Sequence, residues 1–200
     1  LEYDEALTND FTFYGRDGHI ELHARDVADW KVTFVDTGLH SNIGERLMRV
    51  RRFVEDDEMF LANYADGLSN LPLDQHVAQF SRRQAVASLV AVPNPQSLHA
   101  VLSDEEGLVT EVGSVPGDYR WVNGGFFVLR PEIFRYMNEG DELVEQPFRR
   151  LIHEGKLTVF RWGGFWQCMD TFKDKIGFDR MEAKRECPWM VWDAGRAERT

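Results

Sequence analysis

Cysteine is nearly absent from this sequence of 200 residues. Its two cysteines, Cys168 and Cys187, have no regular spacing. Proteins of oxidising compartments commonly carry several paired cysteines, and zinc sites need closely spaced Cys and His ligands. The six histidines share no ligand spacing either: His19, His23, His40, His76, His99 and His153. We therefore expect a reducing compartment, with the cytoplasm as the default, and no zinc site.

Positive charge is also scarce, because 23 Lys and Arg stand against 34 Asp and Glu and leave a net charge of −11. Nucleic acids and anionic membrane surfaces attract proteins through a positive field. We therefore expect no nucleic-acid partner and interpret the arginines at 49, 51 and 52 as a solvated helix face. An anionic substrate would need a metal ion or a local cluster of arginines.

Long hydrophobic runs are missing as well. No apolar run reaches the length of a membrane-spanning helix and no signal-peptide pattern is recognisable, so we expect no membrane partner. Residues 1–9 read as the end of a helix without a cap, which predicts that the natural chain begins earlier. A hydrophobic content of 43%, with 14 Phe and six Trp, is enough for one core. We predict a single domain over 1–200.

Short apolar segments alternate with helical patterns along the chain. The predicted strands are 11–14, 19–23, 31–38, 60–65, 85–92, 98–102, 108–112, 121–130, 157–162 and 165–170. The predicted helices are 46–54, 74–86, a short one from Pro131, 146–154 closed by Gly155, and 171–184. This alternation predicts an α/β fold with a mixed, mostly parallel sheet flanked by helices.

The segment from Phe60 to Leu73 holds the first candidate for chemistry. Its apolar residues end at Ala65, and Asp66-Gly67 breaks the pattern. We predict a buried strand with Asp66 at its carboxyl end, where open α/β sheets bind ligands, and with Gly67 turning the backbone away. An isolated Asp-Gly is more often a plain turn. Asp170 at the end of another predicted strand favours the functional interpretation.

Two further places combine polar residues with glycine. Arg46 starts a predicted helix beside Gly44, where its guanidinium and the helix amides could bind a phosphate together. Asn123-Gly124-Gly125 interrupts an apolar strand. Glycine inside a strand marks either a structural bulge or a close approach of ligand or backbone, and the sequence leaves both interpretations open.

Taken in order, these segments resemble the sugar-1-phosphate nucleotidyltransferases, and among them most of all the glucose-1-phosphate cytidylyltransferases. The segments that carry the resemblance are DTG (36–38), GERL (44–47), NYADG (63–67), NGGFFVL (123–129), FWQCMDTFKDK (165–175) and PWMVW (188–192). The similarity runs from about the first residue to Trp192, with order and spacing preserved.

The resemblance implies a Rossmann-like nucleotidyltransferase fold that lacks its first strands here. It also implies a reaction in which a sugar-1-phosphate oxygen attacks the α-phosphorus of a nucleoside triphosphate and pyrophosphate leaves. Such a reaction needs positioning and charge neutralisation more than a protein nucleophile. The family's two metal-binding aspartates match Asp66 and Asp170, so the expected cofactor is Mg²⁺, which prefers one or two carboxylates plus substrate phosphates.

The same resemblance assigns the substrates and the residues that hold them. Arg46 matches an arginine on the triphosphate, and Asn123 with Gly124 matches positions that contact the sugar. Gly67, beside Asp66, is counted with the substrate-binding residues. The expected partners are a nucleoside triphosphate, with CTP favoured, and a sugar phosphate. Family members are commonly oligomeric, so we also expect a homo-oligomer.

The chain departs from the family pattern in three places, and the first two support an alternative, a nucleotidyltransferase-like binding or regulatory domain without turnover. The Gly-rich loop of the GGxGTR kind and its downstream lysine are absent from these residues. The family's Glu-Lys-Pro step is replaced by the lysine-free segment 112–116, with Arg120 as a possible substitute. Ala65 stands where glycine is usual, and Asn70 where aspartate is frequent.

Overall fold

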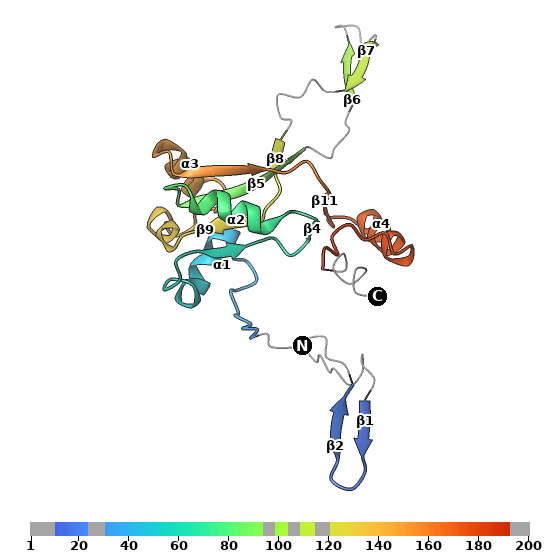
Figure 1. The fold of residues 1–200 in the computed structure, drawn as a ribbon. Coiled ribbons are helices and arrows are strands. Elements are labelled where there is room, and N and C mark those ends of the chain that lie inside the picture. The colour runs from blue at the N-terminus through green and yellow to red at the C-terminus, as the bar shows by residue number, and fades with distance from the viewer. Residues whose placement is uncertain (1–10, 24–30, 94–98, 104–108, 115–120, 193–200) are drawn as a thin grey trace. The chain divides into compact units, whose positions relative to one another are not determined.

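The computed structural model describes residues 11–23, 31–93, 99–103, 109–114 and 121–192 (Figure 1). The chain divides into two compact units, residues 1–36 and residues 37–200, which are described separately here. The helix predicted for residues 1–9 and the substitute proposed at Arg120 lie outside the described residues. The single domain expected over 1–200 stays a prediction.

The first unit contains a β-hairpin. Strand β1 (Phe11–Tyr14) pairs antiparallel with β2 (His19–Leu22), which confirms both predicted strands. The strand predicted for 31–38 is wrong, because these residues form no regular structure. Val32 and Phe34 are 56% and 73% exposed. Alternating apolar residues favour a strand only where another strand pairs with them, and no described strand does so here.

Five strands form the main sheet of the second unit: β3 (Phe60–Ala62), β5 (Ala87–Pro93), β8 (Trp121–Asn123), β9 (Phe127–Leu129) and β10 (Leu157–Arg161). The order is β10-β5-β9-β3, and β8 also pairs with β5. Only β10 and β5 are parallel, while the other three pairings are antiparallel. The α/β class is confirmed, but the mostly parallel sheet is wrong for the described strands.

The connection between β5 and β8 explains why these strands pair antiparallel. Two parallel neighbours need a crossover, usually a helix. The described residues of this connection form instead an antiparallel pair of strands, β6 (His99–Ser103) and β7 (Val109–Ser114). The chain therefore returns beside β5 in the opposite direction, as β8 and then β9.

The helices differ from the predicted ones mainly at their ends. They are α1 (Ile43–Val50), α2 (Leu73–Ser81), α3 (Gln146–His153) and α4 (Phe172–Ala183), with 3-10 turns at Arg51–Phe53 and Pro131–Tyr136. α2 stops five residues before the predicted end at 86, because Val86 already approaches β10 through a backbone hydrogen bond to Lys156. None of the helices in the described part of the chain is long and apolar enough to cross a membrane.

The core confirms the buried strand predicted at 85–92. Val90 and Val92 are almost fully buried, and Leu129 and Leu151 are fully buried. His76 is also fully buried, with its Nε2 atom 2.8 Å from the Ser88 hydroxyl. Burial lowers the pKa of His76 to about 4, so this histidine is a neutral core residue, as expected.

Candidate active site

Two short strands bring Asp66 and Asp170 together. β4 (Gly67–Ser69) pairs antiparallel with β11 (Trp166–Cys168), and Gly67 lies opposite Cys168. One step further, the Met169 N–H donates to the carbonyl oxygen of Asp66 at 2.9 Å. Asp170 follows at once, so two residues far apart in the sequence lie at the same end of one ribbon. Their role as metal ligands stays a prediction.

The Cys168 thiol is influenced by both Asp66 and Asp170. Its thiol donates to Asp170 Oδ2 at 3.0 Å. Burial raises the pKa of the thiol to about 11, with further contributions from Asp170 and, more weakly, from the charge of Asp66. The thiol is therefore protonated at neutral pH and behaves as a hydrogen-bond donor. The thiol thus has a direct contact with Asp170, while Asp66 acts on it only through its charge.

Gly67 has a different place from the one predicted. Instead of turning the backbone away, it is the first residue of β4, and β3 already ends at Ala62. The pairing with Cys168 explains why, since a residue in a strand ladder keeps an extended backbone. Residues 63–66 form the connection, and Asp66 lies at the start of a ribbon rather than at the end of the central strand. The substrate-binding role of Gly67 stays a prediction.

Residues 123–126, which we call the strand break, separate β8 from β9. Gly124 N–H donates to Val90 O at 2.9 Å and Val90 N–H donates to Gly125 O at 3.0 Å, so pairing with β5 continues across it. The backbone has positive φ at Gly125 (75°) and Phe126 (47°). A Cβ on Gly124 would lie 2.9 Å from Val92 Cγ1. Close approach of protein atoms thus accounts for this glycine, and its contact with a sugar stays a prediction.

Asn63 and Tyr64 hold the strand break from the neighbouring segment. Asn63 Oδ1 accepts from the Phe126 N–H at 2.8 Å, at the residue with the unusual φ. Asn123 Nδ2 donates to the Tyr64 hydroxyl at 3.2 Å, and Asn123 Oδ1 accepts from Gly125 N–H at 3.0 Å. Burial is the main cause that raises the pKa of Tyr64. Asn63 was not among the predicted site residues, and its one signal in the sequence is an amide placed directly before the Tyr64–Asp66 run.

An open cleft of about 580 Å³ lies between α1 and residues 62–66. Its polar lining residues are Thr37, Arg46, Asn63, Tyr64 and Asp66, and its apolar ones include Ile43, Leu47, Phe127 and Leu143. The size lies in the range of small-molecule and cofactor sites. Arg46 and Asp66, predicted independently of each other, line the same cleft.

The Arg46 guanidinium is held by the loop before α1. It donates to Ser41 O at 3.0 Å, Thr37 Oγ1 at 3.0 Å and Leu39 O at 3.3 Å. These contacts fix the position of its positive charge at the edge of the cleft. A phosphate that binds Arg46 would compete with, or add to, these neutral acceptors.

Three of the first four amides of the helix predicted to assist Arg46, those of Ile43, Glu45 and Arg46, already have partners, which contradicts this part of the prediction. α1 begins at Ile43, earlier than expected, and Asn42 caps it in a reciprocal pair with Glu45 (2.8 and 3.1 Å). The Ile43 N–H donates to the Glu142 carboxylate at 3.3 Å. With three of its first four amides occupied and the Glu142 carboxylate beside it, this helix start attracts an anion only weakly.

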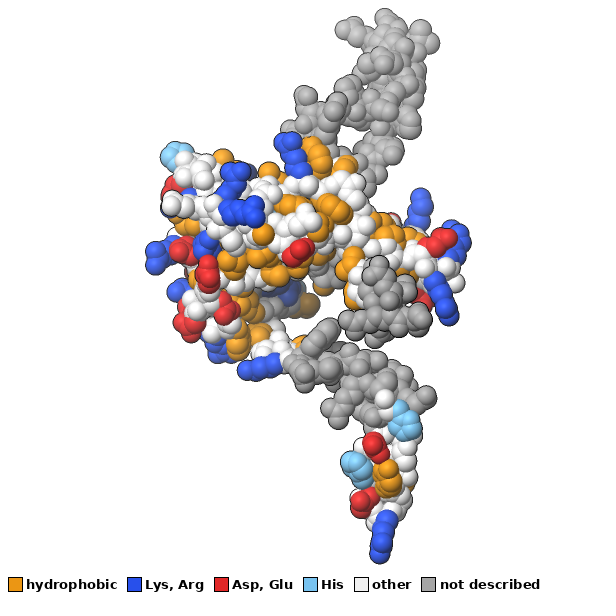
Figure 2. All heavy atoms as spheres, in the orientation of Figure 1, with side chains coloured by type: hydrophobic (Ala, Val, Ile, Leu, Met, Phe, Trp, Pro, Cys, Tyr) orange, Lys and Arg blue, Asp and Glu red, His pale blue; other side chains and the backbone are white. Residues whose placement is uncertain are grey.

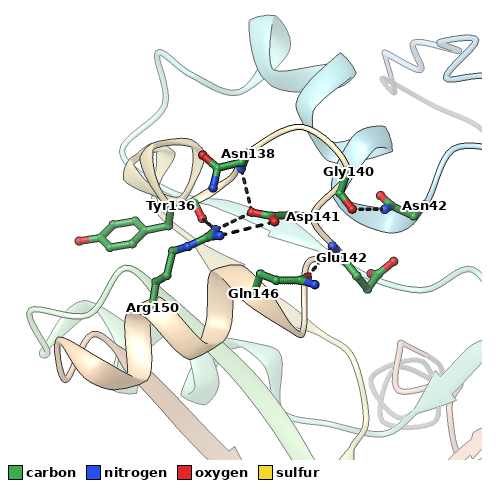
Figure 3. A network of polar contacts seen from close by, with 8 residues as sticks. All are labelled: Asn42, Tyr136, Asn138, Gly140, Asp141, Glu142, Gln146 and Arg150. Carbon is green, nitrogen blue, oxygen red and sulfur yellow. Dashed lines mark hydrogen bonds and ion pairs between the residues drawn. The ribbon is translucent and has the colours of Figure 1, made fainter.

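Gly44 belongs to the same contact rather than to a phosphate loop. A Cβ at Gly44 would overlap the carbonyl oxygen of Asp141. Figure 3 shows the loop responsible, in which Gly140 O accepts from Asn42 Nδ2 at 3.1 Å. Arg150 binds both the Asp141 carboxylate and Tyr136 O. The Arg150 hydrogen bond is the main reason that the pKa of Asp141 is lowered.

The described residues contain no group of three or more His, Cys, Asp or Glu side chains that could hold a metal ion alone. Asp66 and Asp170 nevertheless place two carboxylate-bearing residues at one end of the ribbon, and one or two carboxylates suit Mg²⁺, which usually completes its shell with substrate phosphates and water. The ribbon therefore fits a magnesium ion that binds together with a nucleotide.

Two curated proteins resemble this chain over most of its length. No family model matches the chain. The chain is 34% identical over 187 residues to a glucose-1-phosphate cytidylyltransferase of Salmonella typhi, which covers 92% of this chain and 72% of that protein. It is 30% identical over 194 residues to a protein named probable glucose-1-phosphate cytidylyltransferase of Bacillus subtilis, which covers 96% and 75%.

Among solved structures, HddC from Yersinia pseudotuberculosis matches with a TM-score of 0.49 and 11% identity, over 68% of this chain and 60% of that chain. The chain thus spans about three quarters of the two curated relatives and three fifths of that structure. The identity to the curated relatives extends over most of the chain. The chain therefore belongs to the glucose-1-phosphate cytidylyltransferase family, a group of nucleotidyltransferase enzymes within the sugar-1-phosphate nucleotidyltransferases.

Proposed function

We propose that the protein transfers a cytidylyl group from CTP to a sugar-1-phosphate, with Mg²⁺ as cofactor. A phosphate oxygen of the sugar-1-phosphate forms a bond to the α-phosphorus. The bond from that phosphorus to the oxygen bridging the α- and β-phosphates breaks, and pyrophosphate leaves with its electron pair. The observation that supports this proposal best is the placement of Asp66 and Asp170 at one end of the β4–β11 ribbon.

In this proposal the two aspartates would hold Mg²⁺, which when bound neutralises charge on the triphosphate and the departing pyrophosphate. Arg46 at the edge of the cleft positions the triphosphate through its guanidinium. The Asn123 amide and the Tyr64 hydroxyl, fixed against each other, offer polar atoms to the hydroxyl groups of the sugar. No nucleophilic side chain is needed, because direct in-line displacement depends on positioning and electrostatics.

Pyrophosphate release by the full-length protein tests the proposal. The reaction contains CTP, Mg²⁺ and glucose-1-phosphate, and a second series replaces each substrate by other nucleoside triphosphates and sugar phosphates. We expect Asp66→Asn and Asp170→Asn each to lower kcat by a factor of roughly 10² to 10³, as for the loss of one strong electrostatic contact in an active site. Chelation of Mg²⁺ should abolish release.

Asp56→Asn serves as the matched control, because Asp56 is an exposed carboxylate in the turn after α1. It should leave kcat within about twofold, as surface substitutions usually do. Titration of CTP and Mg²⁺ by calorimetry separates the alternatives. CTP binding without pyrophosphate release from any sugar phosphate would support the regulatory domain, and no binding at all would refute both.

A further inference from the structure

A second hollow of about 570 Å³ lies at the opposite end of the central strands. Ala85 and Val86, which precede β5, and Lys156, which precedes β10, line it. Asn123 of the strand break pairs instead with Ala91, towards the other end of β5. Figure 2 shows Lys and Arg side chains gathered over the end of the second unit that carries α3. The hollow is therefore separate from the cleft that contains Asp66.

The charge of this hollow contrasts with that of the whole chain, which carries a net charge of −11. Five cationic side chains line it: Arg82, Arg83, Arg130, Arg135 and Lys156. Glu132 is the carboxylate among its lining residues. A concave surface lined by charges of one sign concentrates oppositely charged solutes. Such a surface on an acidic protein selects small anions rather than long polyanions, which the rest of the chain repels.

Two of these cations are fixed in place. Arg130 Nε donates to Ala85 O at 3.1 Å, and the guanidinium lies 5.1 Å from the ring centroid of Phe80. Its ion-pair partner Glu58 is 3.7 Å away and 80% exposed, so the pair neutralises it weakly. Lys156 Nζ donates to the Tyr136 hydroxyl and to Glu154 Oε2, both at 2.7 Å. The Glu154 carboxylate offsets part of the Lys156 charge, so a ligand meets oriented positive charge mainly from Arg130, and this orientation lowers the entropy cost of binding.

The other three cations of the hollow are available to bind a ligand. Arg82, Arg83 and Arg135 are exposed, and their guanidinium groups have no hydrogen bond or ion pair with any residue that the structure describes. Three unpaired guanidinium groups at one hollow repel each other, and an anion between them removes that repulsion. Guanidinium presents a planar fork of donors that matches phosphate oxygens two at a time.

From these observations we infer that the hollow between α2 and the 3-10 turn Pro131–Tyr136 is a second binding site, for a small molecule that carries a polyphosphate group. Arg83 and Arg135 contribute forked contacts, while Arg130 and Lys156 contribute fixed charge. The volume lies in the range of ligand sites for molecules of nucleotide size. This inference does not depend on the proposed cytidylyl transfer, because the hollow shares none of its lining residues with the cleft.

Calorimetric titration of inorganic pyrophosphate into the full-length protein tests the inference. EDTA is present, so that metal-dependent binding at Asp66 and Asp170 does not contribute. We expect one pyrophosphate to bind, and its affinity to fall about tenfold or more in the double variant Arg83→Glu/Arg135→Glu, as for the loss of charge-assisted hydrogen bonds. The double variant Arg149→Glu/Arg180→Glu makes the same change of charge with two exposed arginines outside the hollow, and its affinity should stay within about threefold, since distant surface charges are screened.

Hydrogen exchange of the parent protein gives a second readout that does not depend on any variant. Pyrophosphate should slow exchange in residues 82–86 and 130–136. The inference is refuted if pyrophosphate does not bind, if both double variants bind equally well, or if protection appears around the cleft instead. A single variant Arg46→Glu that loses binding while the hollow variant keeps it would place the anion in the cleft and refute the inference as well.

Discussion

Two irregular segments of the second unit, the strand break at 123–126 and the loop 138–145, are fixed in different ways. Neutral amides hold the strand break, and its backbone is strained at Phe126 with φ 47°. Charged groups dominate the loop, where Arg150 binds Asp141 and Glu142 accepts from the first amide of α1. Each segment is part of a contact too close for a Cβ. In the strand break this contact is made by Gly124, and at the loop it is made by Gly44 of α1.

The loop 138–145 therefore acts as a scaffold, and the strand break is the candidate binding site. In the loop, the charges and the helix amides satisfy one another, so little attraction remains for a ligand (Figure 3). In the strand break, hydrogen bonds hold a conformation that costs energy, a pattern that concentrates at functional sites. Asn63 and Tyr64 extend this hold towards Asp66, which follows them by two residues.

We expect the largest effect, a loss of stability, where α1 packs against the loop 138–145. Gly44→Ala places a Cβ against the Asp141 carbonyl, and backbone atoms on both sides cannot yield easily. We expect a loss of about 3 kcal/mol in the free energy of unfolding, at the upper end for overpacking, measured by urea denaturation. Gly163→Ala is the control, because nothing lies within 4 Å of its Cβ position and its φ is not positive. Equal stability of the two variants would contradict the close packing of α1 on the loop.

We expect a smaller effect, on the KM for the sugar phosphate, from a change at the strand break. Asn63→Ala removes the acceptor that holds Phe126, so the KM for the sugar phosphate should rise about tenfold, which corresponds to about 1.4 kcal/mol. The KM for CTP should change much less. Asn63→Asp keeps an acceptor oxygen and should restore most of the loss.

Asn138→Ala in the loop is the matched control for Asn63, since the Asn138 side chain makes no hydrogen bond with a described residue. Steady-state kinetics with each substrate varied in turn should leave this control at parent values. A parallel rise in both KM values for Asn63→Ala would show a general disturbance and remove the special role of the strand break.

We expect the smallest effect on the pH dependence of stability, through Asp141. Arg150 holds the pKa of Asp141 below that of the unfolded chain, so the unfolded state binds the proton first as the pH falls. The stabilisation by this carboxylate is present above the unfolded pKa of about 4 and is lost as the pH falls through the lowered folded pKa. Thermal unfolding of the parent and of Asp141→Asn should therefore differ at pH 7, and the difference should shrink progressively as the pH falls below about 4. Asn63→Ala should show a pH-independent difference from the parent over this range, because its hydrogen bond involves no titrating group.

The parts of the fold that could be predicted from the sequence are those in which local chemistry leaves little choice. The apolar run at 85–92 has to be buried, and it forms β5. Gly155, with φ 67°, ends α3 as expected. The interruption at Asn123–Gly125 appears between β8 and β9. At each of these positions, a single residue type or run determines the backbone.

The rest depends on contacts between distant segments. The 31–38 alternation has no described strand beside it. The start of α1 combines a local cap, formed by Asn42 and Glu45, with a contact to Glu142, which lies 99 residues after Ile43. Asn63 gains its role only because Phe126 lies beside it. Asp66 and Asp170 are the exception, since their places after predicted strands singled both out in the sequence, and the ribbon brings them to the same end.

The ribbon of β4 and β11 lies outside the five-stranded sheet that carries the strand break, and the Trp166 indole joins the two by donating to Gly124 O at 2.8 Å. In the proposed reaction, the sugar would therefore be bound by one sheet and the metal ion by the other, with Trp166 as the contact between them. Residues around Asn123 could then change to admit new sugars while the backbone pairing that places the two aspartates stays as it is.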